Sequence, residues 1–593
     1  MAEFRPMVIT NKGQALIAKM LSGGGNIEFT KIAVSSNTYS DAQILAMTSL
    51  GGVKQTTLIS KVTKTGNAAV QIEGAITNAE LASGYYMNTI ALYAKDPSDG
   101  EIVYAACGAS VPGWMPPYNG VSTSGAFLKL ITTVSNADDV TIEVDPAAVA
   151  TVGDIQNLQE QISDLQSFIG YTDEDIYGVE VDFKNKKFTR LAGAVSKTPG
   201  ASFDGVQAFG GRKRCNVTDA GVVVAYHGDA GYSETGALTQ AIDLNPVDVE
   251  TPDASLQFAA GTKVQVMVEQ PKFYYKVVPL ELEKIAGGKG FHMRKVRYYV
   301  SDTKKEGFKL HPAFIQDGVE KNFIYLSAYE GCFYDATAGD YIKDDSQVYA
   351  SGDFLSSIAN AKPASTQTRS VFRSAANARG AGWSQQTVQS VAATEILFLI
   401  EYASFNMQEK IGIGVSNKTD DGATNMSEIT GATTNLGNES GSVKNTNGWN
   451  IPSYRGEENI YGNIWKWVDG LNRHVKDGIN TIHVADHGFT DNTDAAPYED
   501  VGFTPATGEG YVSAFGYAEK FDWLFICSEH TGNSSLPVGD YYWNTNQSLE
   551  WAVAILGGSW TYGSKCGGFC WHVAYSSGDR TRDIGGRLLY VPQ

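Results

Sequence analysis

A short heptad pattern interrupts this 593-residue sequence and limits the architectures it can adopt. Apolar residues recur there at intervals of 3, 4, 3 and 4 residues, at Ile155, Leu158, Ile162, Leu165 and Ile169. Such spacing is typical of the a and d positions of a coiled coil. A helix over residues 151–169 would be only about 28 Å long, and an isolated helix of that length is marginal in water. The apolar stripe therefore packs on its own domain or, as we predict, forms a short parallel coiled-coil neck at residues 151–170.

The segment before this pattern, residues 1–150, has the alternation of a compact β-rich domain with two short helices. Thr10 has the position of an N-cap for a helix that reaches Met20, and Ser40 with Gln43 has the spacing of a capping box before a second helix. Runs rich in β-branched and aromatic residues predict strands at 27–34, 57–62, 69–76, 85–93, 127–134 and 140–144.

The segment after the pattern returns to short strands and turns. Residues 171–269 read as a β-rich middle module, with a hairpin turning at 184–187 and alternating valines at 264–268. Residues 270–593 differ in composition, since eight of the ten tryptophans lie at or beyond Trp449 and long Gly, Asn, Ser and Thr loops precede them. One amphipathic helix is expected at about 384–408. The predicted fold class is mostly β with α+β.

Charge and composition exclude several classes of protein. The 46 Lys and Arg against 65 Asp and Glu give a net charge of −19, which argues against non-specific nucleic-acid binding because that binding needs cations to displace phosphate counterions. The one dense basic run, residues 211–215, is expected to be a solvated loop. No membrane-spanning helix is expected, and residues 1–20 lack the apolar region of a secretory signal. Six scattered cysteines make no disulfide framework, so a soluble assembly made in a reducing cytoplasm is predicted.

The N-terminus carries the first family resemblance. Residues 4–17, with Ile9-Thr10 and Gly13 followed by Leu16-Ile17-Ala18, and then residues 29–34, resemble the opening of phage tail-fibre proteins. The resemblance implies that residues 1–150 are a baseplate-attachment domain, that the neck is trimeric and that the protein resides at the tail tip of a virion or of a phage-derived particle. The heptad residues alone nominally suit a dimer, with Ile at a and Leu at d.

The C-terminus carries a second resemblance. Residues 455–470, which contain Gly462-Asn463-Ile464-Trp465, and residues 556–560, paired with residues 584–588, are similar to motifs of the C-type lectin fold shared by formylglycine-generating enzymes and phage tropism determinants. The resemblance implies a C-type-lectin-like receptor-binding domain over residues 270–593, which would bind a host surface glycan or protein. Fold alone does not decide chemistry.

Enzymatic alternatives rest on few residues. Formylglycine-generating enzymes bind copper through a cysteine pair just after the equivalent of Trp560, whereas Cys566 and Cys570 are displaced from that position. A tailspike glycan depolymerase would need two carboxylates about 5–10 Å apart beside a groove, and nothing in the sequence pairs any two. We therefore expect no enzyme and keep a copper oxidoreductase and a depolymerase as alternatives.

Metal ions and cofactors are not expected either. His483 and His487 have the four-residue spacing of a helical zinc pair but lack the accompanying glutamate, so they are interpreted as strand-end or loop histidines. The clusters Asp420-Asp421 and Asp491/Asp494 lack the spacing of a calcium loop and are interpreted as solvated.

Receptor binding is the function that remains. Residues 543–583 interleave aromatic and basic side chains, which dominate binding hot spots, with Gly and Ser, which let loops adapt. Trp551, Trp560 and Phe569 are assigned to the core. This tract also resembles the variable region of tropism determinants that retroelements diversify. The predicted receptor-binding residues are Trp543, Tyr562, Lys565, Trp571, His572, Tyr575, Arg580 and Arg582.

Overall fold

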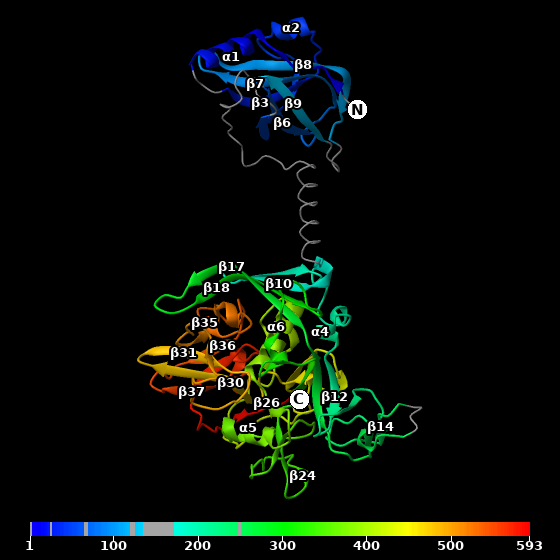
Figure 1. The fold of residues 1–593 in the computed structure, drawn as a ribbon, viewed down its shortest axis with the longest axis vertical. Coiled ribbons are helices and arrows are strands. Elements are labelled where there is room, and N and C mark those ends of the chain that lie inside the picture. The colour runs from blue at the N-terminus through cyan, green and yellow to red at the C-terminus, as the bar shows by residue number, and fades with distance from the viewer. Residues whose placement is uncertain (1–2, 24–26, 65–68, 119–124, 134–170, 247–250) are drawn as a thin grey trace. The chain divides into compact units, whose positions relative to one another are not determined.

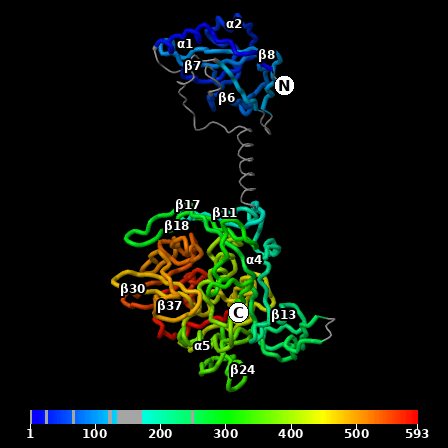
Figure 2. Tube along the Cα trace, viewed as in Figure 1, coloured from blue at the N-terminus to red at the C-terminus, as the bar shows by residue number. Residues whose placement is uncertain are grey.

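The computed structural model describes residues 3–23, 27–64, 69–118, 125–133, 171–246 and 251–593, and these fall into two compact units, Met1–Phe168 and Ile169–Gln593. Strands predominate in both units (Figures 1 and 2), so the predicted class, mostly β with α+β, is confirmed. The coiled-coil neck predicted at 151–170, with all five heptad residues, lies outside the described residues. Among the residues described, no helix has the length and apolarity needed to cross a bilayer.

Two antiparallel sheets and two helices form the N-terminal unit. The larger sheet has the order β1-β8-β7-β3-β4, with β2 on β8, and the smaller has the order β5-β6-β9. Their bounds are β1 Glu3–Phe4, β2 Val8–Ile9, β3 Glu28–Ser35, β4 Val53–Leu58, β5 Lys61–Lys64, β6 Ala69–Thr77, β7 Tyr85–Asp96, β8 Gly100–Met115 and β9 Gly125–Thr133; the helices are α1 Asn11–Gly23 and α2 Asp41–Leu45.

Both helices of this unit begin where the sequence predicts. The hydroxyl of Thr10 accepts a hydrogen bond from the backbone N–H of Gly13 at 3.0 Å, and Ser40 with Gln43 forms the predicted capping box. Gly13 also lets α1 lie against β8, because a Cβ at this position would sit 2.2 Å from the carbonyl oxygen of Tyr104.

Strand β8 is the main element that the sequence analysis missed. Ile102–Cys107 in its centre is buried on both faces, so the segment lacks the alternation of apolar and polar residues by which half-buried strands are recognised. The run predicted at 57–62 divides into the ends of two strands, β4 and β5, and the run at 140–144 lies outside the described residues.

Three large sheets form the C-terminal unit. The first has the order β11-β10-β18-β17-β19 with β34 and β35 beyond β18; the second is β13-β12-β16-β22-β40-β26; the third is β32-β31-β30-β37-β38-β36-β33 with β39 on β30. Their bounds are β10 Tyr177–Asp182, β11 Lys187–Ala192, β12 Lys213–Val217, β13 Val223–Tyr226, β16 Gln265–Pro271, β17 Tyr274–Lys284, β18 Phe291–Ser301, β19 Lys309–Leu310, β22 Phe323–Ser327, β26 Trp383–Gln385, β30 Trp465–Lys476, β31 Ile479–Val484, β32 Glu499–Asp500, β33 Gly508–Tyr511, β34 Ala514–Tyr517, β35 Cys527–Glu529, β36 Tyr541–Asn544, β37 Trp551–Leu556, β38 Trp571–Tyr575, β39 Ile584–Gly585 and β40 Leu588–Tyr590.

Short elements complete this unit. The helices are α4 Gln207–Gly210, α5 Arg369–Asn377, α6 Val388–Tyr402 and α7 Met407–Ile411. The small sheets consist of β14 Ile242–Asp243 with β15 Gln257–Phe258, β20 Ile315–Gln316 with β21 Val319–Glu320, β23 Cys332–Asp335 with β24 Asp340–Tyr341 and β25 Phe354–Ser356, and β27 Gly441–Lys444 with β28 Asn450–Tyr454 and β29 Glu457–Glu458.

The segment predicted as a middle module, residues 171–269, is part of this unit. Its predicted hairpin is present as β10 and β11, with Val181 opposite Phe188. However, β10 pairs with β18, and β16 pairs with β22, so both sheets continue across position 269. Local alternation identified these strands, but the partners that fix their place lie about 50 to 120 residues further along the chain.

The expectation that the basic run at 211–215 is a solvated loop is wrong. Arg212 and Arg214 are buried. Arg212 pairs with Glu457, and the guanidinium of Arg214 donates to the carbonyl oxygen of Gly456 at 2.9 Å and to the hydroxyl of Tyr329 at 3.0 Å. The run therefore links β12 to distant loops in place of facing solvent.

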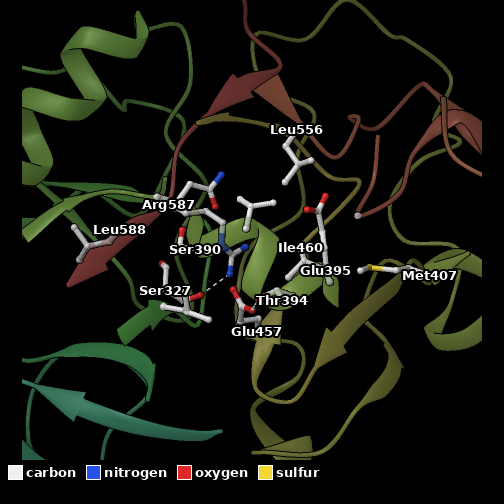
Figure 3. A pocket seen from close by; sticks show the side chains of 14 residues that line it. Ser327, Ser390, Thr394, Glu395, Met407, Glu457, Ile460, Leu556, Arg587 and Leu588 are labelled. Atoms are coloured by element: carbon white, nitrogen blue, oxygen red, sulfur yellow. Dashed lines mark hydrogen bonds between the residues drawn. The ribbon is translucent and has the colours of Figure 1, made fainter. Parts of the chain in front are cut away.

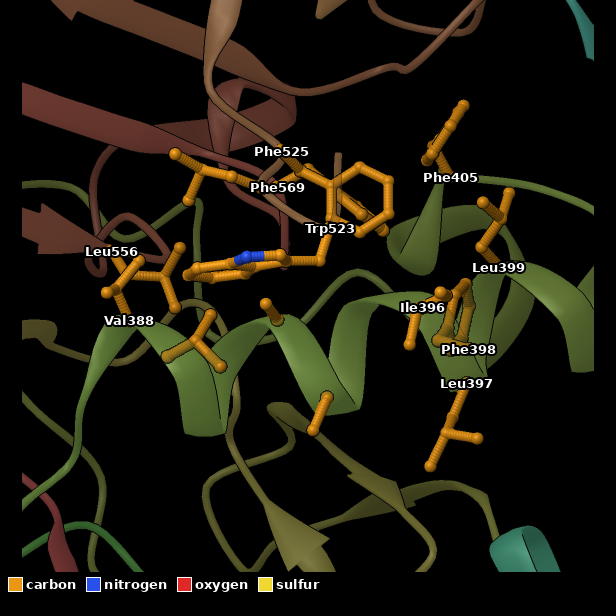
Figure 4. Close-up of a cluster of buried hydrophobic side chains, with 14 of the residues drawn as sticks. Val388, Ile396, Leu397, Phe398, Leu399, Phe405, Trp523, Phe525, Leu556 and Phe569 are labelled. Carbon is orange, nitrogen blue, oxygen red and sulfur yellow. The ribbon is translucent and has the colours of Figure 1, made fainter. Parts of the chain in front are cut away.

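Helix α6 corrects the expectation of an amphipathic helix at 384–408. Every residue from Val388 to Glu401 is buried. Figure 4 shows Leu397 and Leu399 pointing to opposite sides of the helix, while Phe525 and Phe569 from distant segments pack in the same cluster. A helix surrounded by sheets and loops has no solvent face, which explains why its sequence is apolar nearly all round.

Candidate functional site

The two C-terminal sequence motifs meet in the third large sheet. Lys466 on β30 lies opposite Leu556 on β37, and Trp465 pairs in parallel with Ile584 on β39. Trp465 and Trp467 are completely buried. Because indoles bury large areas, this sheet gives a fixed base for the side chains that project from β36 and β38.

An aromatic cluster stands on this base and consists of Tyr541, Trp543, Tyr562, His572 and Tyr575. Trp543 lies opposite His572 across the β36–β38 pair, with their rings stacked 5.7 Å apart. Tyr541 packs on Trp543 at 4.5 Å, Tyr562 meets Trp543 edge-on at 5.5 Å, and Tyr575 lies 4.5 Å from His572. Trp543 is buried, which corrects the prediction that it is a receptor-binding residue, whereas the other four rings are each partly exposed. The cluster is thus a continuous aromatic surface with a buried centre.

One cation borders the cluster. The loop after Trp560 forms a short 3₁₀ turn, Gly563–Lys565, which places the Lys565 ammonium 4.3 Å from the ring centroid of Tyr541. The adjacent Ser564 hydroxyl lies 2.8 Å from the hydroxyl of Tyr511, on β33. A cation over an aromatic face is stabilised by the ring quadrupole, so the loop is held against the strands.

The rings of the cluster are uncharged near neutral pH. Burial, with a smaller contribution from Arg473, lowers the pKa of His572 to about 3. Burial also raises the pKa of Tyr562 and of Tyr575. Aromatic faces without charge suit stacking on sugar rings or on the side chains of another protein. Lys565 adds a positively charged donor at the edge.

The predicted binding residues divide into three groups. Trp543, Tyr562, Lys565, His572 and Tyr575 come together as described, and Arg580 is exposed beyond the end of β38. The prediction that Trp571 binds the receptor is corrected, because this residue is buried and its indole donates a hydrogen bond to Glu395 at 3.2 Å. Arg582 pairs with Asp420 and also donates to the carbonyl of Ala423, so it connects two loops.

Sequence analysis missed two members of this surface. Tyr541 shares a strand face with Trp543 because residues two apart point the same way, and this alternation was available as a signal. Tyr511 reaches the surface only because β33 pairs with β36. Of the predicted core residues, Trp560 and Phe569 are buried, whereas Trp551 is partly exposed.

The residues considered as candidate metal ligands do not come together as the motifs would require. His483 lies in β31 and His487 in the following loop, so they do not share a helix. Asp491 is not solvated as expected: burial raises its pKa, but Arg369 and Arg373 outweigh burial and hold the pKa below the usual range. Cys566 and Cys570 are buried, and burial raises the pKa of both thiols. The thiolates that copper requires are therefore disfavoured here.

A small cavity lies beside α6 (Figure 3). Arg587, Glu457, Thr394 and Glu395 are among its lining residues. Its volume is about 30 Å³, which is room for about one water molecule. This interior space suits solvent and not a substrate.

These features define a class of protein: a modular, mostly β chain that joins a small N-terminal unit to a larger unit with an aromatic surface. Residues 1–153 match the family model described as phage tail-collar fibre protein, N-terminal. Residues 1–153 are therefore similar to the N-terminal part of phage tail-collar fibre proteins, which confirms the predicted resemblance there.

Solved structures add a further likeness. The Major Tropism Determinant I1 and U1 variants each match at 11% identity, covering 64% of this chain and 72% of theirs, with a TM-score of 0.22. The M1 variant matches at 13% identity, covering 64% of this chain and 71% of its own, with a TM-score of 0.21. No curated protein gives a significant match to the sequence.

Proposed function

We propose that this protein is a phage tail fibre that attaches to the tail through its N-terminal domain and binds a host-cell receptor through its C-terminal unit. The match of residues 1–153 to the tail-fibre family carries the proposal. A tail fibre requires an attachment end and a recognition end. The separation of the chain into two compact units supports such a division of labour.

The recognition end is proposed to be the aromatic cluster of the C-type-lectin-like unit. Tyr541, Tyr562, His572 and Tyr575 are partly exposed, Lys565 borders them over the ring of Tyr541, and tyrosine is among the residues enriched in binding hot spots. Arg580 extends the surface. The ligand is proposed to be a glycan or protein of the host surface, since either can be bound by stacking on these rings. No catalytic step is part of the proposal.

We further propose a homotrimer, in which second and third copies of the chain cover apolar surface. Phe127 and Ile131 are exposed on the outward face of β9, on either side of the exposed Lys129, while Leu128 and Leu130 are buried on the other face. The heptad residues from Ile155 to Ile169 follow in the sequence. Three copies would present three receptor sites, and simultaneous binding would raise the avidity.

Cell binding by the two halves of the chain tests the assignment of roles. Labelled protein of residues 171–593 is expected to bind host cells, and protein of residues 1–170 is not, whereas only the latter should bind purified tail particles. Circular dichroism would first establish that both are folded. The assignment fails if residues 1–170 bind cells as well as residues 171–593 do.

A further inference from the structure

Two histidines and an aspartate meet on the outer part of the third sheet, away from the aromatic cluster. His474 on β30 and His483 on β31 lie on the same face, since His474 is opposite Thr481, two residues before His483. Asp494 comes from the loop between β31 and β32. Within the described part of the chain, these three residues each offer a ligating atom within 4.8 Å of the others.

The hydrogen bonds of His483 can leave one ring nitrogen with a lone pair. The hydroxyl of Thr481 lies 3.2 Å from the carbonyl oxygen of His474, to which it can donate. The same hydroxyl lies 2.9 Å from Nε2 of His483, and this hydrogen bond can run in either direction, according to the tautomer of the ring. In the tautomer that carries its proton on Nε2, Nδ1 of His483 is a buried acceptor with no hydrogen-bond partner.

His474 has a similar arrangement. Its Nδ1 lies 3.0 Å from Oδ2 of Asp494, and its Nε2 is buried without a hydrogen-bond partner. The ring is stacked on Trp551 at 3.7 Å, which fixes its orientation. Both histidines are more than nine-tenths buried. Nδ1 is therefore the nitrogen of His474 that faces Asp494, and together with the unpartnered Nδ1 of His483 it can bind a shared ligand.

The charges that face the histidines favour a cation. Asp494 and Glu550 are the carboxylates nearest to His474, with Oε1 of Glu550 3.7 Å from its Nε2. Asp500 lies across from His483 in β32 and is paired with Lys289 at 3.1 Å.

We propose that His474, His483 and Asp494 bind one divalent transition-metal ion of the Zn²⁺ type, with water or Glu550 in the fourth position. Imidazole and carboxylate ligands suit this class of ion. Tetrahedral Zn²⁺ needs ligating atoms about 3.4 Å apart, so the set has to contract slightly, and the half-exposed side chain of Asp494 can move to allow it. The hydrogen bond from His483 to Thr481 is the outer contact that orients a metal-bound histidine.

Binding would fix the loop that carries Asp494 to the β30–β31 hairpin. Asn492 in the same loop donates to the hydroxyl of Ser577 at 2.8 Å, just beyond β38. A bound ion would thereby restrict movement next to the exposed residue Arg580. This proposal does not depend on the proposed receptor.

Calorimetric titration of the full chain, stripped with EDTA, by Zn²⁺ tests the site. We expect one ion per chain, and Co²⁺ in its place should give the absorption bands of tetrahedral coordination. His483→Gln and Asp494→Asn should each weaken the affinity on the order of 100-fold, since even outer residues of metal sites matter about 10–100-fold. Zn²⁺ should raise the melting temperature of the wild type but not of His483→Gln.

His487→Gln is the matched control, because His487 lies four residues from His483 and is half-exposed beside Asp486. This variant should bind Zn²⁺ as the wild type does. Asp494→Asn affects an exposed loop side chain, so it reports on the site even if His483→Gln unfolds. Absence of saturable binding to the wild type, or unchanged affinity in Asp494→Asn, would overturn the proposal.

Discussion

In the N-terminal unit charged side chains pair at the surface, whereas in the C-terminal unit several pairs lie in the core. Lys12–Asp99 and Lys31–Glu101 are solvent-accessible, but Arg369–Asp469 and Lys466–Glu330 are almost completely buried. In the first unit, backbone N–H and carbonyl groups are hydrogen-bonded to one another within its two sheets. In the second unit, buried arginines donate to backbone carbonyls at places where strands bulge or end.

Arginine side chains illustrate this difference. Arg369 donates to the carbonyl oxygens of Val468 and Leu471, and Arg587 donates to those of Ser327 and Glu458. Buried carbonyl groups need such partners where no strand supplies them. The comparison shows that buried charge can take the place of regular backbone pairing in a unit rich in loops.

Removing one member of a buried pair should have the largest effect. Glu330→Ala leaves the ammonium of Lys466 without its carboxylate at 3.0 Å and should lower the free energy of unfolding of the C-terminal unit by about 3–5 kcal/mol. Denaturant unfolding followed by tryptophan fluorescence measures this. A loss below about 1 kcal/mol would remove the distinction between the two units.

The second largest effect is expected for receptor binding, which a substitution in the C-terminal unit should weaken and one in the N-terminal unit should not. Tyr562→Ala removes a partly exposed ring of the aromatic cluster and should lower the affinity for host cells about 10- to 30-fold, corresponding to about 1.4–2 kcal/mol. Tyr86→Ala, an exposed ring of the N-terminal unit, is the control and should leave cell binding unchanged. Equal losses in both variants would mean that the surface of the cluster has no special role.

A buried carboxyl group should make the C-terminal unit sensitive to pH. Burial raises the pKa of Glu395 well above its ordinary value, so the carboxyl stays neutral in the fold. The unfolded chain ionises it above about pH 4, so the wild type loses stability as the pH rises through that value. Glu395→Gln can still accept from Trp571, and it should gain stability relative to the wild type between about pH 4 and 7. Urea unfolding at several pH values would show no such trend if Glu395 were ionised in the fold.

The smallest effect is expected at a surface pair of the N-terminal unit. Asp99→Ala removes the partner of Lys12, and both side chains are exposed. Exposed pairs contribute about 0–1 kcal/mol, so the unfolding midpoint should hardly change and should become independent of this pair in high salt. A loss as large as that of Glu330→Ala would contradict the comparison.

Local contacts were predictable from sequence because their donors and acceptors lie within a few residues. The Thr10 cap, the Ser40–Gln43 capping box and the β10–β11 hairpin are of this kind. The N-terminal motif was also sufficient to identify a tail-fibre domain. Predictions from the sequence were less successful where the residues that contact a side chain lie far along the chain.

Burial is the property that only the tertiary structure decided. Nothing near Trp571 in sequence indicates that its indole would face Glu395 on α6, 176 residues earlier in the chain. The sequence alone determined the composition, the local caps and strands and the two family motifs, since these depend on neighbouring residues. The closed surroundings of α6 were decided by packing against segments more than a hundred residues further along the chain, such as those of Phe525 and Phe569, and the exposed rings of the cluster by the pairing of β36 with β38.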